Sequence, residues 1–166
     1  YHLEGEEGFT PTGKEDVYIC DDAWIEMYKY SAAQYLEKDS KIITDFLSRA
    51  AEKSEYVEIL VNPLLAATYV GVGEYDKAEK LADRIRDLNT EGVDYYLVKT
   101  MISRYRDADY EKAIKICNDG ISVLGDLDNA SVILPAYGYI LELQKGINYI
   151  MLEDYEKAYE AVAQGY

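Results

Sequence analysis

The stretch that determines the fold is Tyr75-Asp76-Lys77-Ala78, which returns nearly unchanged as Tyr110-Glu111-Lys112-Ala113 and as Tyr155-Glu156-Lys157-Ala158. Successive copies lie 35 and 45 residues apart, which is the scale of one helical hairpin. Each copy follows one run of apolar residues with helical spacing and opens another. The sequence therefore predicts an all-α fold in which antiparallel helix pairs stack side by side as an α-solenoid.

Working outward from these copies, the helical periodicity divides the chain into about four hairpins. The lead-in, residues 1–16, is rich in glycine and acids and predicts a flexible linker, so the repeat domain is expected to span 17–166. The predicted hairpins cover about 22–53, 56–88, 91–121 and 131–166.

Aspartates are expected to cap the second helix of three pairs. Asp39, Asp109 and Asp154 each follow a break, and a carboxylate there accepts hydrogen bonds from the first free amides of a helix. In the first pair, Ile42 stands where the other pairs have the alanine of the repeated stretch.

The sequence leaves the start or end of several other helices open. The third helix either begins at Asn62-Pro63 or begins near Glu55 and bends at Pro63. We expect it to end in a tight turn at Gly71-Val72-Gly73. The irregular residues 122–131 form either a long loop or a lengthened helix, and the following helix is expected to start at Ser131 or Leu134.

The pattern of small and aromatic residues around the repeated stretch resembles the tetratricopeptide repeat (TPR) family. Leu65, Ala66 and Tyr69 precede the first copy, and Gly146 with Tyr149 precedes the last. The third predicted pair departs from the family pattern, because Met101 and Arg104 stand where a small residue and a tyrosine are usual. The resemblance implies a right-handed superhelix whose repeat-forming residues are Tyr75, Ala78, Tyr110, Ala113, Tyr155 and Ala158.

The same resemblance implies that the first helix of each pair lines a concave wall that binds a partner. Carried over to this chain, the candidate partner-binding groove is apolar and aromatic, with Trp24, Tyr95 and Tyr105 as the expected hot spots. A second interpretation is that these residues are core, or are covered by residues 1–16. The groove comprises Trp24, Met27, Tyr35, Leu60, Ala67, Tyr95, Val98, Ile102, Tyr105, Ile140, Leu143, Ile147 and Ile150.

Composition limits the partners. The chain holds 32 acids against 17 bases, for a net charge of −15, so it repels nucleic acid and anionic membranes. No apolar run is long enough to span a bilayer, which argues against direct membrane insertion. Tyrosine is unusually frequent, with 18 copies against two Phe and one Trp, and it suits half-exposed helix faces.

Histidine and cysteine, the residue types most used in nucleophilic catalysis and zinc binding, are scarce in this chain. The single histidine, His2, lies in the predicted linker, so a Ser/His or Cys/His nucleophile would have no anchored base. Cys20 and Cys117 are not spaced for zinc, and whether they form a disulfide stays open. The sequence predicts a protein that is not an enzyme and has neither a metal site nor a cofactor.

The predicted function is a scaffold module that binds a protein or peptide, with a basic or amphipathic-helical partner suiting the acidic, apolar surface. The alternative is a structural spacer or self-association domain, including a homodimer, in a membrane-anchored bacterial regulator. The chain begins at Tyr1 and is expected to be a soluble piece of a larger protein. Its compartment, cytoplasmic or extracytoplasmic, stays open.

Overall fold

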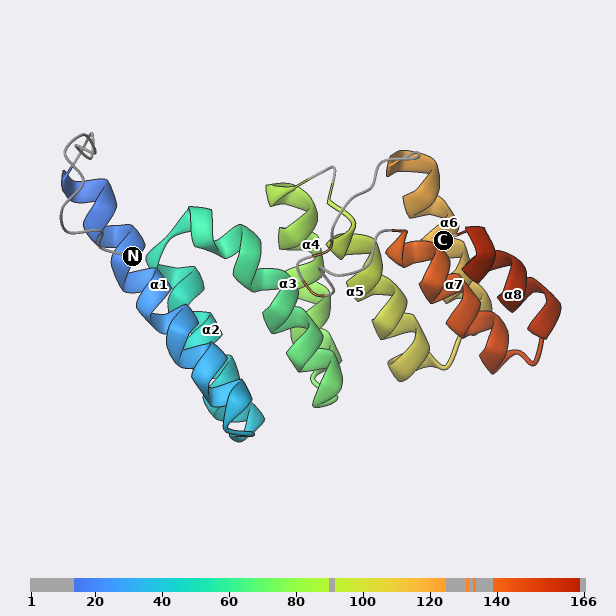
Figure 1. The fold of residues 1–166 in the computed structure, drawn as a ribbon, viewed down its shortest axis with the longest axis horizontal. Helices are drawn as coiled ribbons and strands as arrows, with labels where there is room; N and C mark the ends of the chain where they lie inside the picture. Colours follow the sequence, from blue (N-terminus) through green and yellow to red (C-terminus); the bar gives the residue numbers. More distant parts are fainter. Residues whose placement is uncertain (1–13, 90–91, 125–130, 132, 134–138, 165–166) are drawn as a thin grey trace.

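The computed structural model describes residues 14–89, 92–124, 131, 133 and 139–164, and the described chain contains eight α-helices and no strand. The helices lie side by side in one row along the long axis of the molecule (Figure 1). The predicted all-α class is therefore confirmed. The helices are α1 (Lys14–Tyr35), α2 (Ser40–Lys53), α3 (Glu55–Gly71), α4 (Tyr75–Leu88), α5 (Asp94–Ile102), α6 (Tyr110–Leu124), α7 (Ile140–Met151) and α8 (Tyr155–Gln164).

Packing follows the order of the chain. Each helix contacts the next, and the odd-numbered helices also contact one another in turn, α1 with α3, α3 with α5 and α5 with α7. In the part of the chain that the structure describes, the even-numbered helices contact one another much less or not at all. The first helices of the pairs thus form the more closely packed side, as expected for a stack of helical hairpins.

The core runs along the array as three successive clusters, and each spans neighbouring hairpins. Leu47 of α2 and Val61 of α3 belong to the first, Ala82 of α4 and Val98 of α5 to the second, and Leu97 of α5 with Leu141 of α7 to the third. Because each hairpin buries its apolar side against its neighbours, no single pair holds a complete core.

The turns inside three of the four pairs close in the same way. In each, a residue in the left-handed region ends the first helix, and the next amide donates to the carbonyl five residues earlier. These bonds define equivalent positions in the three pairs. The left-handed residues are Glu37, Gly73 and Glu153, and the bonds run from Lys38 to Ala33, from Glu74 to Tyr69 and from Asp154 to Tyr149.

The predicted caps and repeat junctions are confirmed. The carboxylates of Asp39, Asp109 and Asp154 accept hydrogen bonds from the amides of the first turn at 2.7, 2.8 and 3.2 Å. Each repeated tyrosine is the first residue of its helix, and each repeated alanine is buried. These residues are Tyr75 and Ala78 in α4, Tyr110 and Ala113 in α6, and Tyr155 and Ala158 in α8.

The first pair departs from the expected register. Ile42 is exposed, and it is Ile43 that packs against the core. The reason is one additional residue in the turn, since both Lys38 and Asp39 separate left-handed Glu37 from the first residue of α2. The alignment of Ile42 with the repeated alanine was therefore wrong by one position.

The second interpretation of the third helix is the correct one. α3 begins at Glu55, and the side chain of Ser54 accepts a hydrogen bond from the amide of Val57. Pro63 lies inside the helix, where it has no amide hydrogen to donate, and α3 changes direction along its length (Figure 1).

Two further boundaries differ from the expectation. α1 begins at Lys14, inside the segment predicted as a linker, whereas residues 1–13 lie outside the described part of the chain. α7 begins at Ile140, while the alternative start at Leu134 lies outside the described residues. Ser131 is not helical because its hydroxyl is bonded to the Asp94 carboxylate at the start of α5, and Tyr139 has a positive φ of 49°.

The third pair has an unusual end to its first helix. Residues Ser103–Asp107 form a π-helical turn, η1, which is followed by Ala108 in the left-handed region. The Asp109 amide donates to the Ser103 carbonyl, six residues earlier, instead of to the residue five earlier as in the other pairs. Arg104 and Tyr105 lie within this wider turn, and single π-helical turns are frequent at functional positions.

Candidate binding surface

The predicted wall is only partly accessible. Val98, Ile102 and Ile140 are buried in the core, so these three cannot contact a partner and their assignment to the groove was wrong. Val98 and Ile102 pack in the cluster shared by α3, α4 and α5, and Ile140 packs against α5 and α6. The close stacking of the first helices fills the space that a continuous groove would need.

An exposed apolar patch remains on the first helices of the third and fourth pairs. Tyr105 in η1 is 57% exposed and Ile150 in α7 is 50% exposed, and Ile147 lies one turn before Ile150. Leu143, one further turn back, is half-buried. Tyr105 belongs to η1, which directly follows α5, and the other three side chains belong to α7, which contacts α5. We call Tyr105, Leu143, Ile147 and Ile150 the C-terminal patch.

The other predicted residues lie elsewhere on the array, on α1, α3 and the start of α5. Trp24 and Tyr35 are exposed on α1, whereas Met27 packs against the first core cluster. Tyr95 is half-buried at the start of α5, where its ring lies 5.3 Å from the Arg86 guanidinium. The expected hot spots Trp24, Tyr95 and Tyr105 thus do not form one surface. Leu60 and Ala67 are half-buried in α3.

A buried polar cluster lies between the third and fourth pairs, and the sequence analysis did not assign it. Arg104 is 8% exposed, and it donates to Asn148 Oδ1 at 2.9 Å and to Gln144 Oε1 at 2.7 Å. Among the described residues no carboxylate lies within ion-pair distance of its guanidinium. The departure from the family pattern at Arg104 was the signal that could have indicated the cluster.

An ion network surrounds the outer end of the same pair. Glu79 of α4 pairs with Lys99 and with Arg106, and Asp107 pairs with Arg106 at 2.7 Å and with Lys112 at 2.9 Å. Hydrogen bonds from Arg106 and Lys112 lower the pKa of Asp107 to about 2. Burial and the nearby Lys112 and Arg106 cations lower the pKa of Lys99, although Glu79 lies against it. The network connects α4, α5, η1 and α6.

A polar groove of about 390 Å³ lies between the first and second pairs. The start of α2 forms one side and the α3–α4 turn forms the other. Its lining mixes three carboxylates with two lysines and four hydroxyls, so no single sign of charge dominates. The lining residues are Asp39, Ser40, Lys41, Thr44, Asp45, Ser48, Tyr69, Val72, Glu74 and Lys77.

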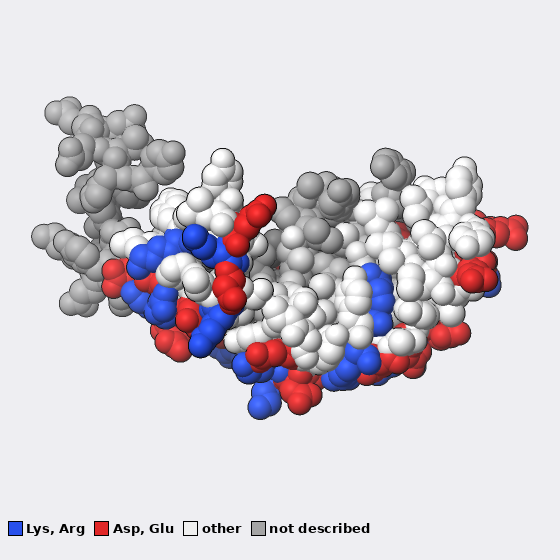
Figure 2. Space-filling view, turned by 90° about the horizontal axis from the view of Figure 1, so that it is seen from below, with Lys and Arg blue, Asp and Glu red and all other residues white. Residues whose placement is uncertain are grey.

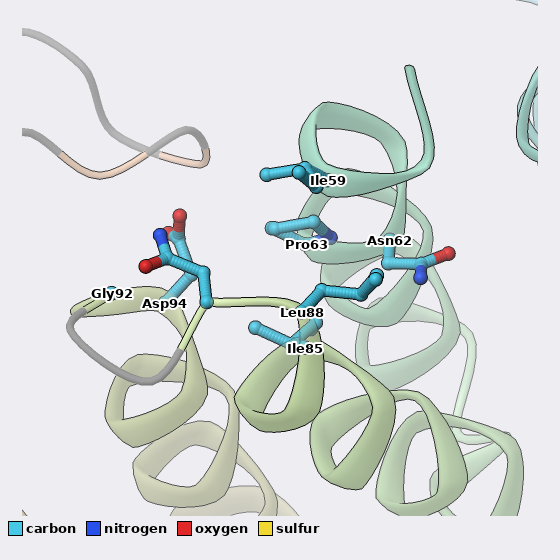
Figure 3. A pocket seen from close by; sticks show the side chains of 8 residues that line it. Ile59, Asn62, Pro63, Ile85, Leu88, Gly92 and Asp94 are labelled. Carbon is cyan, nitrogen blue, oxygen red and sulfur yellow. The ribbon is translucent and has the colours of Figure 1, made fainter. Parts of the chain in front are cut away.

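A second cavity lies where α3, α4 and the start of α5 meet. Figure 3 shows Ile59 and Pro63 extending toward the side where Asp94 lies, while the Asn62 amide turns away and donates to Glu58. The cavity volume is about 20 Å³, which is room for one water molecule. It is too small for an organic ligand.

Cys117 is a free thiol buried in α6, and the side chain of Cys20 lies outside the described part of the structure. Its Sγ lies 3.3 Å from the Thr100 hydroxyl, and burial raises the pKa of the thiol to about 11. The thiolate is the reactive form, so the folded protein keeps this cysteine protected.

We expect a Cys20→Ser variant, in which Cys117 is the single cysteine, to react with a thiol reagent at neutral pH only as fast as the protein unfolds. The measurement is the labelling rate with and without denaturant. Rapid stoichiometric labelling of the native protein would show that the α5–α6 interior is open.

Charged residues are mixed on the surface. Figure 2 shows basic side chains gathered over the end of the array formed by α1 and α2, and acidic side chains at the end formed by α7 and α8, with broad uncharged areas between. Within the described residues, no group of three or more His, Cys, Asp and Glu side chains has the arrangement of a metal site. No described helix has the length and apolar character to cross a membrane.

No protein-family model matches this chain, and no curated protein matches it either. The resemblance to tetratricopeptide repeats thus depends on the repeated stretch and on the hairpin geometry described above.

Proposed function

We propose that this chain is a TPR-like repeat module, a right-handed superhelix that binds a protein or peptide and performs no catalysis. Three features support the proposal: the identical closure of three turns, the burial of each repeated alanine, and the successive contacts between odd-numbered helices. Modules of this architecture present extended surfaces to partners.

The observation that carries the binding function is the C-terminal patch. Tyr105 on η1 and Ile150 on α7 both leave large apolar area in water, and exposed apolar surface of this kind is typical of interaction sites. Since the patch follows the helix direction, an amphipathic helical peptide would fit it, with apolar residues at three- and four-residue spacing. Basic residues flanking that apolar face would complement the net charge of −15.

The proposal can be tested with a panel of immobilised amphipathic helical peptides carrying basic flanks. We expect the wild-type chain to bind a subset of the panel, and a Tyr105→Ala/Ile150→Ala double variant to bind the same peptides at least about tenfold more weakly. The reason is that both side chains are mostly exposed, so their truncation removes contact area without opening the core.

The matched control is Ile42→Ala, which truncates an exposed aliphatic side chain on α2, far along the row from the patch. Its peptide binding should equal that of the wild type. Equal binding by the double variant, or no preference for the panel over scrambled peptides, would contradict the proposed site.

A second candidate function is a spacer or self-association unit, for example in the extracytoplasmic arm of a membrane-anchored bacterial regulator. The observation that favours it is a second exposed apolar face on α1, which includes Trp24, Ile25 and Tyr28. Sedimentation separates the two candidates, because a monomer with an intact C-terminal patch favours peptide binding.

A further inference from the structure

The guanidinium of Arg104 carries a positive charge that the described chain does not neutralise. Its Nε donates to Asn148 Oδ1 and its Nη2 donates to Gln144 Oε1, so both partners are uncharged amides. Within the described residues no carboxylate reaches this guanidinium, and the mostly buried Glu142 of α7 pairs with Lys145 at 2.8 Å. A buried charge is costly unless an opposite charge lies beside it. Arg104 therefore lacks the counter-charge that a buried cation ordinarily has.

The first pair shows how this chain compensates a buried charge elsewhere. Glu26 of α1 is as well buried as Arg104, and its carboxylate pairs with Lys29 at 2.7 Å and with Arg49 at 2.9 Å. Two cations from the chain itself thus neutralise one buried acid. The contrast indicates that the missing counter-charge of Arg104 comes from outside the described chain.

One edge of the Arg104 guanidinium is open to solvent. The third nitrogen, Nη1, donates no hydrogen bond within the described residues, and it is accessible rather than enclosed by protein atoms. The Tyr105 ring of the C-terminal patch lies 5.7 Å from the guanidinium carbon. Gln144 and Asn148 each directly follow a patch residue along α7. The guanidinium therefore lies next to the proposed peptide-binding surface.

The guanidinium is fixed in position before any partner binds. Its two amide partners come from successive turns of α7, and the Asn148 amide also donates to the Gln144 carbonyl at 2.8 Å. Because the Arg104 side chain is already ordered, contact with an anion costs little additional side-chain entropy. Hydrogen bonds between a guanidinium and a carboxylate are also stronger than bonds between neutral groups.

We propose that Arg104 receives the carboxylate of an Asp or Glu side chain on the apolar face of the partner helix. The inference rests on the proposed peptide-binding function and adds one acidic residue to the apolar face of the partner. Along α7, Leu143 of the patch precedes the two amide residues and Ile150 follows them. A helix that covers this patch extends past Arg104 in both directions, which favours an internal side chain over the carboxylate of a chain end.

The net charge of −15 is compatible with one acid in the partner. Exposed charges more than about 8 Å apart are largely screened at physiological ionic strength, whereas a contact with a partly buried cation is screened much less. Basic flanks of the partner would face the acidic surface, and the single acid would face Arg104. A partner with lysine at this position would place a like charge against the guanidinium and would be rejected.

The test uses pairs of amphipathic helical peptides with basic flanks. The two members of a pair differ at one central position of the apolar face, which is Glu in one and Gln in the other. Both have an amidated C-terminus, so the Glu side chain is the single carboxylate. We expect the wild-type chain to bind the Glu member about tenfold more tightly, because hydrogen bonds between charged groups contribute more than neutral ones. Isothermal titration calorimetry measures both affinities.

Gln144→Glu neutralises the site from within while it keeps an acceptor for Arg104. The new carboxylate would replace the amide oxygen that lies 2.7 Å from Arg104 Nη2. We expect this variant to fold and to bind the Glu and Gln members with affinities within about twofold of each other. The matched control is Gln34→Glu, the same substitution on an exposed residue of α1, which should keep the wild-type preference. Circular dichroism verifies that both variants fold.

Equal affinity of the wild type for the Glu and Gln members would overturn the inference and leave the peptide-binding function standing. A preference for Glu that persists in Gln144→Glu would also overturn it, because the acid would then contact another cation. A third peptide, the Gln member with a free C-terminal carboxylate, should bind no better than its amidated form. Tighter binding of this peptide than of the Glu member would contradict the internal side chain. Failure of every peptide to bind would contradict the proposed function, and this inference with it.

Discussion

Replacement of Arg104 by methionine should lower the free energy of unfolding by about 3 kcal/mol, because it leaves two buried amides without a donor. Arg104 is the shared donor to Gln144 Oε1 and Asn148 Oδ1, and all three residues are buried between the third and fourth pairs. Methionine fills much of the same volume but donates no hydrogen bond. Urea unfolding followed by circular dichroism measures the loss.

Two further variants make this result specific to the cluster. Arg106→Met alters the next arginine along η1, whose ion pairs are exposed, and should cost less than about 1 kcal/mol. The triple variant Arg104→Met/Gln144→Leu/Asn148→Leu removes the unpaired amides as well and should recover most of the loss, because an apolar cluster can replace a buried polar one. A loss below about 0.5 kcal/mol in the single variant would mean that the amides find other partners.

Gly120→Ala should destabilise the protein by about 2 kcal/mol, although alanine is the better helix former. A Cβ at position 120 would lie 2.6 Å from Leu141 Cδ1 and 2.7 Å from Tyr96 Cγ. α6 approaches α5 and α7 so closely at this position that only glycine fits without a shift of the neighbours. Thermal unfolding of the variant measures the effect.

Gly71→Ala is the matched control, since it makes the same substitution near the end of α3, where no atom lies within 4 Å of the added Cβ. It should be neutral or should stabilise by about 0.5 kcal/mol, through the reduced freedom of the unfolded chain. Equal stability of the two variants would show that α6 does not depend on close approach at Gly120.

Much of the fold could be predicted because its signals are local. Asp109 and Asp154 follow breaks in periodicity and bind the first amides of a helix, which depends only on residues a few positions apart. The repeated alanines could be placed in the core because helical spacing alone locates the apolar face. The start of α7 could not be predicted, since Ser131 bonds to Asp94, 37 residues away.

The candidate site was harder to predict than the fold. Exposure depends on how closely neighbouring helices approach, and no pattern within one helix reports that distance. Val98 and Tyr105 both lie on the predicted wall, yet the first is buried and the second is mostly exposed. Val98 is buried because α5 packs on α3 and α4 at this position. Tyr105 lies in the π-helical turn, outside that cluster.

The amino-acid sequence by itself determined the helical class, the repeat of hairpins, the capped helix starts and the apolar face of each helix, since periodicity and capping act within a few residues. Only the tertiary structure decided which wall residues stay in water and how Arg104 is satisfied. These properties depend on contacts between side chains of different hairpins, because a side chain is buried only where a second surface packs against it.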